Sequence, residues 1–517
     1  MESASMTAPK KSLSWQAHLP DGAPYDPSAQ GAGTPLRVWK RHREHDPERI
    51  CLIDASGQSL SWSEFDEASR RKAEILALAG IAAGHRVLCS SASSLESVLA
   101  HAACLRLGAV ALPTNTAYRK AELRHVIEDA RPSAAIVDDR ERAHWIKEAD
   151  PRITVFTPEM EESPTPSHAV ELDRSDPQDP ALIGYTSGTT GRPKGAILSH
   201  ANLLASVEAL RIAWRWTPED RLVLCLPLFH MHGLGVGLHG TLHTGASAVV
   251  LSGFDPDAVF DAIAEHDATL FFGVPTLYHR LIDHPRVGEL SRLRLCVSGS
   301  APLPAELHGQ FEKVTGQHIV ERYGMTETAM LVSNPVEGDR RAGTVGIPLP
   351  GVEVRLQGEP AQIEVRGPNV FSGYWERPDA NEEAFTNDGF FQTGDLGEFD
   401  PEGYLRISGR AKELIISGGY NVYPREVEEA LRLHPDVTEA AVVGTPSDEW
   451  GEAVTAYLVT ARELPLEELR SFLKERLAPY KHPRILYSVE ALPRNALGKI
   501  QKHRLSDGAI IPDEAAP

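Results

Sequence analysis

Apolar and polar residues follow two alternating patterns along residues 181–324. Short apolar runs typical of buried strands are separated by segments with the spacing of amphipathic helices. This alternation predicts a parallel sheet flanked by helices. The expected strands are 221–227, 247–251, 269–274, 293–297 and 318–322, and the expected helices are 256–266, 276–284 and 304–315.

The same alternation occurs earlier, with helical patterns at 63–79 and 94–106 around a strand at 86–89, which predicts a second α/β layer. After Pro350 the chain changes to short strands with Gly and Pro turns, at 351–356 and 362–366, typical of a small β module. Beyond residues 409–412 the order strand, helix, strand, strand, helix, strand predicts a compact α+β unit. We therefore expect an α/β chain with a flexible arm (1–30), a large N-terminal domain of two α/β layers plus the β module (31–409), and a small C-terminal α+β domain (410–517).

Length, charge and cysteine content narrow the class of protein. A chain of 517 residues is too long for one compact core and suggests about two to four domains. A net charge of −20 argues against a nucleic-acid binder or a binder of acidic membranes, because neutralising phosphates requires a basic surface. The five cysteines are scattered without a CxxC pair, which is typical of a reducing cytoplasm and not of a disulfide framework or zinc knuckle.

Targeting and membrane segments are not expected. The apolar run at 268–278 contains Gly273 and Pro275 and is too short to cross a bilayer. The first thirty residues have no continuous apolar stretch, so they resemble a loose arm and not a signal peptide. We expect a cytoplasmic monomer or homodimer that acts on small molecules, without nucleic acid and without an integral membrane segment.

The strongest candidate for chemistry is the polar, glycine-rich segment 185–195, which follows an apolar strand-like run at 181–184. Glycines allow close approach of an anion, hydroxyls add donors, and a lysine adds mobile positive charge, as a polyphosphate site requires. Pro193 precedes Lys194 and Gly195 follows it, so the segment does not fit the Walker pattern of a P-loop kinase. The alternative is a flexible surface turn. The expected phosphate-binding residues are Thr186, Ser187, Gly188, Thr189, Thr190, Gly191 and Lys194.

A second candidate is the strand-end turn 323–328. The ring of Tyr323 can stack on an adenine, Thr326 can bond a phosphate, and Glu327 can hold a hard magnesium ion through oxygen. Farther on, Asp395 lies on a glycine turn, where a carboxylate suits the two hydroxyls of a ribose. Arg410 is a further candidate for ribose or phosphate. Taken alone, each of these two residues is more typical of a surface ion-pair partner.

Together these motifs resemble the adenylate-forming acyl-CoA synthetases, from about residue 36 to 505. The resemblance implies ATP, Mg²⁺ and CoA as ligands, with Glu327 and Thr186 at the metal. It implies that Lys499, in the loop 493–499, stabilises the transition state of adenylation. It further implies that the C-terminal domain is mobile and turns about Lys412. The turn Ser417, Gly418 and Gly419 then approaches CoA, while Ser300, Ala301 and Gly324 line the nucleotide.

The same resemblance assigns an acyl pocket to His230, Ser298 and Met325, with His230, Thr326 and Glu327 catalytic beside Lys499. His230 and His232 also suggest a metal pair, but the neighbouring sequence offers no third ligand to complete a site. Within the family, residues 273–280 and 321–328 look most like malonyl-CoA synthetases. That subgroup implies that Arg280 pairs with the distal carboxylate of malonate, for which a guanidinium fork is well suited. The alternative is an exposed helical arginine.

The implied reaction has two steps: the acid attacks the α-phosphate of ATP to give an acyl adenylate and pyrophosphate, and the CoA thiol then displaces AMP. Methylmalonate differs from malonate by one methyl group, worth only about 1–3 kcal/mol of discrimination, so both acids are candidates. Other open interpretations are a ligase for an aryl, medium-chain or other monocarboxylic acid, a stand-alone adenylation domain that acylates a carrier protein, and a non-catalytic protein that keeps the fold.

Overall fold

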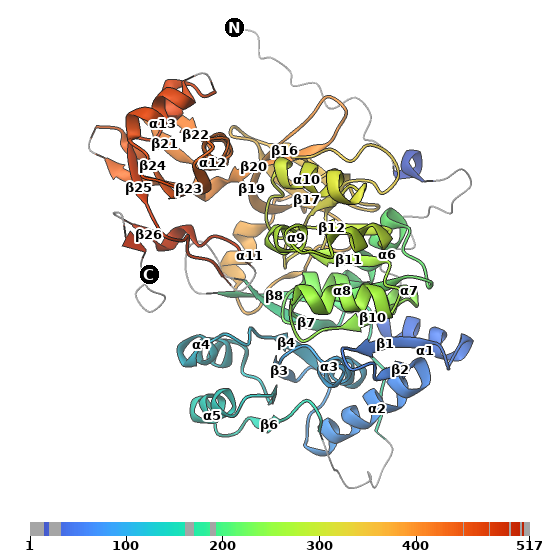
Figure 1. Ribbon diagram of the computed structural model, residues 1–517. Helices are drawn as coiled ribbons and strands as arrows, with labels where there is room; N and C mark the ends of the chain where they lie inside the picture. The colour runs from blue at the N-terminus through green and yellow to red at the C-terminus, as the bar shows by residue number, and fades with distance from the viewer. Residues whose placement is uncertain are drawn as a thin grey trace.

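The computed structural model describes residues 15–19, 33–160, 170–186, 193–447, 449–474, 476–495, 498–506 and 509–510. The described chain forms a large N-terminal body and a smaller C-terminal body beside it (Figure 1). Across these ranges no helix is both long and apolar enough to cross a bilayer.

The first large sheet has seven strands in the order β18-β8-β7-β4-β3-β5-β6. Neighbours from β7 to β6 in this order pair in parallel, whereas β8 and β18 are antiparallel to their neighbours. The strands are β3 (Arg86–Ser90), β4 (Val110–Pro113), β5 (Ala134–Val137), β6 (Thr154–Phe156), β7 (Pro180–Thr186), β8 (Lys194–Ser199) and β18 (Gly373–Tyr374).

The second large sheet has nine strands in the order β15-β14-β13-β12-β11-β9-β10-β1-β2. Its central strands from β13 to β1 are parallel, and antiparallel strands close both edges. The strands are β1 (Ile50–Asp54), β2 (Ser59–Ser61), β9 (Arg221–Leu224), β10 (Ser247–Val250), β11 (Leu270–Gly273), β12 (Leu295–Ser298), β13 (Val320–Tyr323), β14 (Val332–Ser333) and β15 (Ile347–Pro348).

Two helices are buried between these sheets because their apolar residues surround the whole helix. Every residue of α3 (Leu95–Leu107) except Glu96 and Ser97 is buried, and so is every residue of α6 (His200–Trp214) except Glu208 and Arg211. A helix that is apolar all round cannot lie at a surface. The sheets therefore stand on either side of this layer and share one central core.

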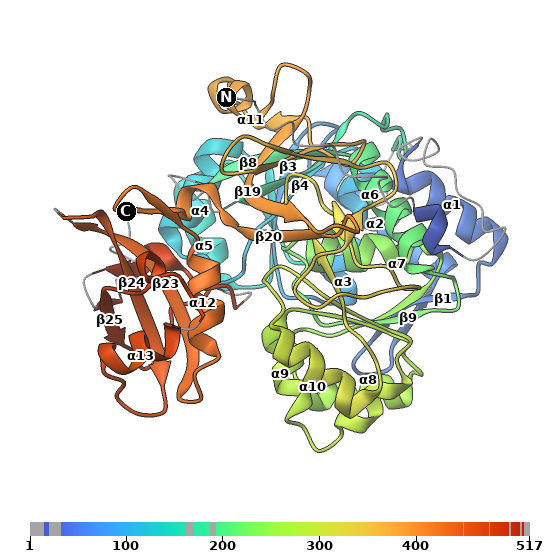
Figure 2. The same ribbon diagram turned by 90° about the horizontal axis from the view of Figure 1, so that it is seen from above.

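Other helices cover the outer faces. Successive strand residues enter different cores, as β-geometry requires: Phe272 faces the central core and Phe271 the outer one. In Figure 2, α8, α9 and α10 gather on one side of the molecule, and α4 and α5 on another. These outer helices are α4 (Lys120–Ala130), α5 (Arg140–Ala149), α8 (Pro256–Glu265), α9 (Pro275–Ile282) and α10 (Ala305–Thr315). The remaining helices of this body include α1 (Pro35–His45), α2 (Trp62–Leu78), α7 (His239–Thr244) and α11 (Pro378–Ala384).

Two smaller sheets complete the chain. A four-stranded antiparallel sheet contains β16 (Glu353–Gln357), β17 (Gln362–Arg366), β19 (Phe391–Phe399) and β20 (Leu405–Arg410). A five-stranded sheet with its own core forms the C-terminal body. It contains β21 (Ile415–Ser417), β22 (Tyr420–Val422), β23 (Val437–Ser447), β24 (Gly451–Thr460) and β25 (Ile485–Ser488), with α12 (Pro424–Arg432) and α13 (Leu466–Leu473), and the pair β26 (Leu505–Ser506) and β27 (Ala509–Ile510) follows it.

The predicted fold class is confirmed: a mixed α/β chain with a large N-terminal domain and a smaller C-terminal domain. Each helix and strand expected between residues 221 and 322 is present, with ends shifted by a few residues. Two details differ. The polar segment after β7 leads into the antiparallel strand β8, so it closes a hairpin. The first strand expected in the C-terminal unit is a pair, β21 and β22.

The turn after β13 is tied to the body by Asn369, whose side chain is 2% exposed. Its amide nitrogen donates to the carbonyls of Thr328 at 2.8 Å and Met330 at 2.7 Å. Replacing Asn369 with alanine leaves two buried acceptors without their donor. We expect Asn369→Ala to lower the free energy of unfolding by about 1–3 kcal/mol in denaturant titrations. Asn387→Ala, at an exposed turn position, is the control and should change it by less than about 0.5 kcal/mol. Equal effects of the two substitutions would contradict this role.

Candidate active site

A cavity of about 960 Å³ opens where the large sheets, the four-stranded sheet and the C-terminal body meet. Its walls come from chain segments far apart in sequence, at the ends of β4, β7, β13 and β20 and at the loop before the C-terminus. Among the predicted site residues, those that line it are Thr186, Lys194, His230, Ser300, Gly324, Met325, Thr326, Glu327, Arg410, Lys412 and Lys499.

One wall is built on a contact between β13, β19 and β20. Asp395 and Arg410 are directly paired residues on the antiparallel strands β19 and β20, and their side chains form an ion pair at 3.2 Å. The Tyr323 hydroxyl donates to the other Asp395 oxygen at 2.5 Å. Burial and the nearby carboxylate raise the pKa of Tyr323 well above its usual range, and the Asp395 charge raises the pKa of Arg410. The structure therefore brings Tyr323, Asp395 and Arg410 together, although the Asp395 carboxylate is already bonded on both sides.

Glu327 supplies a buried carboxylate to the cavity. It is 5% exposed and accepts a hydrogen bond from the Tyr374 hydroxyl at 3.0 Å. Burial raises the pKa of Glu327, because the charged form loses its hydration. Lys194 lies over the Tyr374 ring, with its Nζ 5.2 Å from the ring centre. An oxygen ligand that is desolvated and has one neutral donor fits a hard divalent cation such as Mg²⁺.

Thr326 sits against β7, which explains a glycine in that strand. A Cβ placed on Gly184 would lie 2.5 Å from Thr326 Cγ2, closer than packing allows. The strand therefore lets the turn after β13 approach the start of the predicted phosphate loop. Thr186 and Lys194 begin and end that loop, with the Thr186 hydroxyl 3.4 Å from the Lys194 carbonyl. Ser187, Gly188, Thr189, Thr190 and Gly191 lie outside the described residues.

In another part of the cavity lining, His230 is half-buried and His232 is buried, and both lie near Arg322. Burial lowers the pKa of His230 to about 4, with smaller effects from Arg322 and Lys499, so the ring is neutral at physiological pH. His232 lies parallel to Phe272, 6.4 Å between ring centres, and its Nδ1 is 3.4 Å from the Ser300 hydroxyl. Among the described residues, these two histidines belong to no cluster with a third metal ligand.

Arg322 is the functional candidate that the sequence patterns missed. The residue is 4% exposed and lines the cavity, and its Nε and Nη2 have no hydrogen-bond partner within the described part of the chain. Burial lowers its pKa to about 9, which still leaves the guanidinium charged near neutral pH. Gly299 makes room for it, since a Cβ there would lie 2.4 Å from the guanidinium carbon. The sequence did contain a signal for this site. Arg322 is a charged residue within a strand predicted to be buried, and such residues rarely lie in a core without a function.

Lys499 reaches this cleft from the C-terminal body. Two hydrogen bonds join Lys499 and Asn495: Lys499 N donates to the Asn495 side chain at 2.9 Å, and Asn495 N donates to the Lys499 carbonyl at 2.9 Å. The neighbouring Gly498 approaches Thr276 of the large body closely. Burial lowers the pKa of Lys499, and the positive charge of Arg410 lowers it further.

Several predicted site residues lie elsewhere. Arg280 is exposed on α9, where its guanidinium stacks 4.8 Å from the Phe254 ring centre, and it does not line the cavity. Its assignment to the acyl pocket is therefore wrong for this structure, because α9 turns Tyr278 and Leu281 inward instead. Ser298 is fully buried at the end of β12 and Ala301 is half-buried, and neither is among the cavity's lining residues. The turn Ser417, Gly418 and Gly419 lies on the C-terminal sheet, where Gly418 N donates to the Trp450 carbonyl at 2.8 Å.

Comparison with known proteins agrees with this arrangement. Residues 39–375 match the AMP-binding enzyme family, and residues 426–499 match the AMP-binding enzyme C-terminal domain. The mitochondrial malonate–CoA ligase ACSF3 of Mus musculus is 36% identical over 89% of this chain and 88% of its own length. A feruloyl-CoA synthase of Amycolatopsis is 35% identical over 92% and 98%.

The solved structure of ATP-bound MatB from Rhodopseudomonas palustris is 40% identical, covers 91% of this chain and 97% of its own, and superposes with a TM-score of 0.85. Both parts of the family match in order, and they meet at the cavity described above. The chain therefore belongs to the AMP-binding enzyme family and is an ATP-dependent acyl-CoA synthetase.

Proposed function

We propose that the acid activated by this enzyme is a short dicarboxylate, malonate or methylmalonate. The observation that carries the proposal is the Arg322 guanidinium, which is charged, buried and short of hydrogen-bond partners at the acyl end of the cavity. A buried cation without a partner is costly, and a second carboxylate on the substrate would supply the missing charge and acceptors. A malonate–CoA ligase among the relatives supports the same choice.

A monocarboxylic acid is the principal alternative, and the feruloyl-CoA synthase relative favours it. An uncharged acyl chain would leave the buried Arg322 charge without a counter-ion, which lowers the affinity of such an acid relative to a dicarboxylate. His230, neutral at physiological pH, adds a polar but uncharged wall to the same pocket. In the proposed site the Arg322 guanidinium pairs with the second carboxylate, and the neighbouring His230 ring carries no charge that would compete for that carboxylate.

In the proposed first half-reaction one malonate carboxylate oxygen attacks the α-phosphorus of ATP, and pyrophosphate leaves. Glu327, with Thr186, would hold Mg²⁺, which neutralises phosphate charge when bound. Lys194 and the hydroxyls of the phosphate loop would contact the departing phosphates. Thr326 would donate to the α-phosphate and Lys499 would stabilise the charge that develops there.

The second half-reaction requires the CoA thiolate to attack the acyl carbonyl, with AMP as the leaving group. Lys499 occupies the cleft in the present conformation, so CoA access requires the C-terminal domain to move. We place the hinge at Lys412, between β20 and β21, and the domains at 31–409 and 410–517. The turn at Ser417, Gly418 and Gly419 would then face CoA.

A panel of acids tests the substrate. Purified enzyme with ATP, Mg²⁺ and CoA should release AMP and form a thioester fastest with malonate or methylmalonate, and much more slowly with propionate or butyrate. Arg322→Met should lower kcat/KM for malonate by about 100- to 1000-fold, the effect of losing a buried charge partner, and should change propionate activity far less. Arg280→Ala, at the exposed arginine, is the matched control and should stay within about twofold.

Proportional loss on malonate and propionate in Arg322→Met, with ATP binding intact, would show that Arg322 is structural. Malonate-dependent AMP release without malonyl-CoA would favour an adenylation domain that serves a carrier protein. Absence of AMP with every acid would contradict catalysis itself.

Lys499 can be tested by separating the half-reactions. Lys499→Ala should slow formation of malonyl-AMP by about 100- to 1000-fold, the usual effect of removing one charge stabiliser. Conversion of supplied malonyl-AMP and CoA to thioester should be nearly unchanged. Lys474→Ala, at an exposed lysine of the same domain, should affect neither step. Equal losses in both steps would contradict the assigned role.

The rate of adenylation should also depend on the charge of Lys499. Because burial lowers its pKa, the ammonium form is lost at a lower pH than for an ordinary lysine, which titrates near about 10.4. Single-turnover adenylation should therefore decline on the alkaline side below that pH. Lys499→Arg, if active, should keep its charge and move the decline to higher pH. An unchanged profile in that variant would assign the titration to another group.

A further inference from the structure

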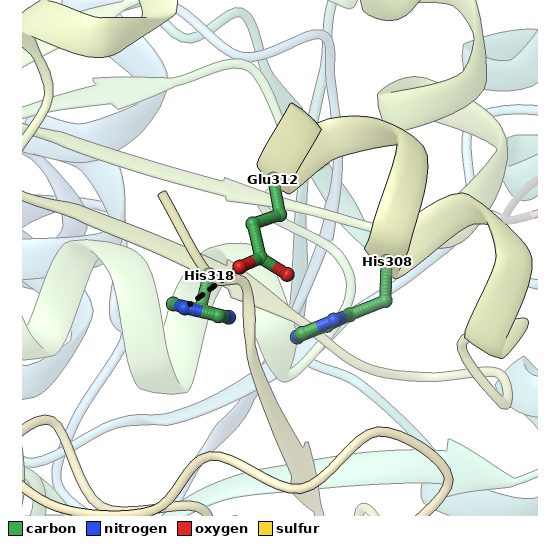
Figure 3. A group of neighbouring side chains, drawn as sticks. All are labelled: His308, Glu312 and His318. Carbon is green, nitrogen blue, oxygen red and sulfur yellow. Dashed lines mark ion pairs between the residues drawn. The ribbon is translucent and has the colours of Figure 1, made fainter. Parts of the chain in front are cut away.

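Outside the cleft, three side chains that can ligate metals converge at the end of α10. His308 and Glu312 are one helical turn apart on α10, and His318 comes from the segment that leads into β13 (Figure 3). One ligand atom from each lies within 4.8 Å of the other two. Their convergence depends on Gly316, whose positive φ of 72° ends the helix and turns the chain back along it.

The distance between His318 and Glu312 suits a small transition-metal ion. His318 Nε2 and Glu312 Oε1 are 3.3 Å apart, and bonds of about 2.0–2.1 Å in a tetrahedral site place neighbouring ligand atoms about 3.4 Å apart. Histidine with a carboxylate is a usual zinc ligand set. Side-chain exposures of 45% for His318 and 47% for Glu312 leave an entry path and allow both to adjust.

His308 has the support that a metal ligand requires. Its Nε2 is 3.2 Å from the Ile319 carbonyl, so it donates its ring proton there and leaves the Nδ1 lone pair for a cation. Such a bond from the second ring nitrogen to a backbone carbonyl is the usual outer support of a metal-bound histidine. Arg340 is the nearby cation, and it donates to the carbonyls of His318 and Val336.

A second cluster of possible metal ligands differs, because an arginine already pairs with its carboxylates. His434, Asp436 and Glu468 also lie close together, but the Arg462 guanidinium bonds both carboxylates. The Asp436 backbone N–H is donated to His434 Nδ1. Within the described residues no lysine or arginine forms an ion pair with Glu312; its partner is His318.

We propose that His308, Glu312 and His318 form a binding site for one divalent transition-metal ion of the zinc class, completed by water. The site is distinct from the magnesium position at Glu327 and does not depend on the acid that the enzyme activates. A bound ion joins the end of α10 to the start of β13, the strand that carries Arg322 and Tyr323. Its effect is therefore on stability and positioning, and the ion touches no reacting atom.

The test uses the full-length chain without a polyhistidine tag and without ATP, titrated with Zn²⁺ by calorimetry and by thermal unfolding. The wild-type protein should bind one more equivalent of Zn²⁺ than His318→Ala does. Its Tm should rise with Zn²⁺ concentration, because an ion that binds only the folded state stabilises that state. Glu312→Gln should weaken this equivalent by at least about tenfold. Both variants should match the wild-type Tm in a chelator, because Glu312 and His318 are exposed.

His279→Ala is the matched control. His279 of α9 and Asp283, the residue just after that helix, form a similar exposed pair with 3.3 Å between atoms, and they belong to no three-ligand group within the described chain. This variant should bind Zn²⁺ as wild type does. The proposal is overturned if His318→Ala keeps the wild-type stoichiometry and affinity, or if wild type shows no saturable Zn²⁺ binding and no Tm shift at micromolar concentrations.

Discussion

The turn that follows β13 is held from three directions, and the geometry of the cleft depends on this clamp. The Tyr323 hydroxyl is bonded to Asp395, Thr326 packs against the bare backbone of Gly184, and Asn369 donates to carbonyls on the far side of the turn. These contacts join the two large sheets and the four-stranded sheet at one point. Groups that stabilise the charge developing in a transition state need such fixed positions, because the free energy spent on reorienting them during the reaction would reduce that stabilisation.

The second organising feature is charge. The chain as a whole is acidic, yet the cleft gathers Lys194, Arg322, Arg410 and Lys499 around the buried carboxylates of Glu327 and Asp395. Burial increases the influence of each charge and also shifts pKa values, lowering those of Arg322 and Lys499 and raising that of Glu327. An anionic substrate would offset the buried positive charges, and a divalent cation would offset the buried carboxylate charge. The cleft is thus suited to ligands that bring several phosphates and carboxylates.

Local patterns were sufficient for most secondary structure. The period of apolar residues located the strands β9 to β13 and the helices α8, α9 and α10, because a buried strand and an amphipathic helix impose different spacings on the same chain. The helix α7, between β9 and β10, was not predicted. The motifs at Tyr323, Glu327, Asp395 and Lys499 were also recognisable without coordinates. The error at Arg280 has a simple cause: spacing shows which residues share a face of α9, but the neighbouring sheet decides which face turns inward. Tyr278 and Leu281 occupy that inner face.

The sequence by itself determined the class of fold, the order of its parts and the residue types at the nucleotide site, because these depend on local periodicity and short motifs. The tertiary structure alone decided which distant residues meet. Arg322 became a candidate for carboxylate recognition only when β13, Gly299 and the segment at His230 enclosed it, with no partner for its Nε and Nη2 among the described residues. Likewise, His318 joined His308 and Glu312 only through the turn at Gly316. In the first case packing removes solvent around a charged atom, and in the second a turn of the chain brings distant ligands together; sequence spacing records neither.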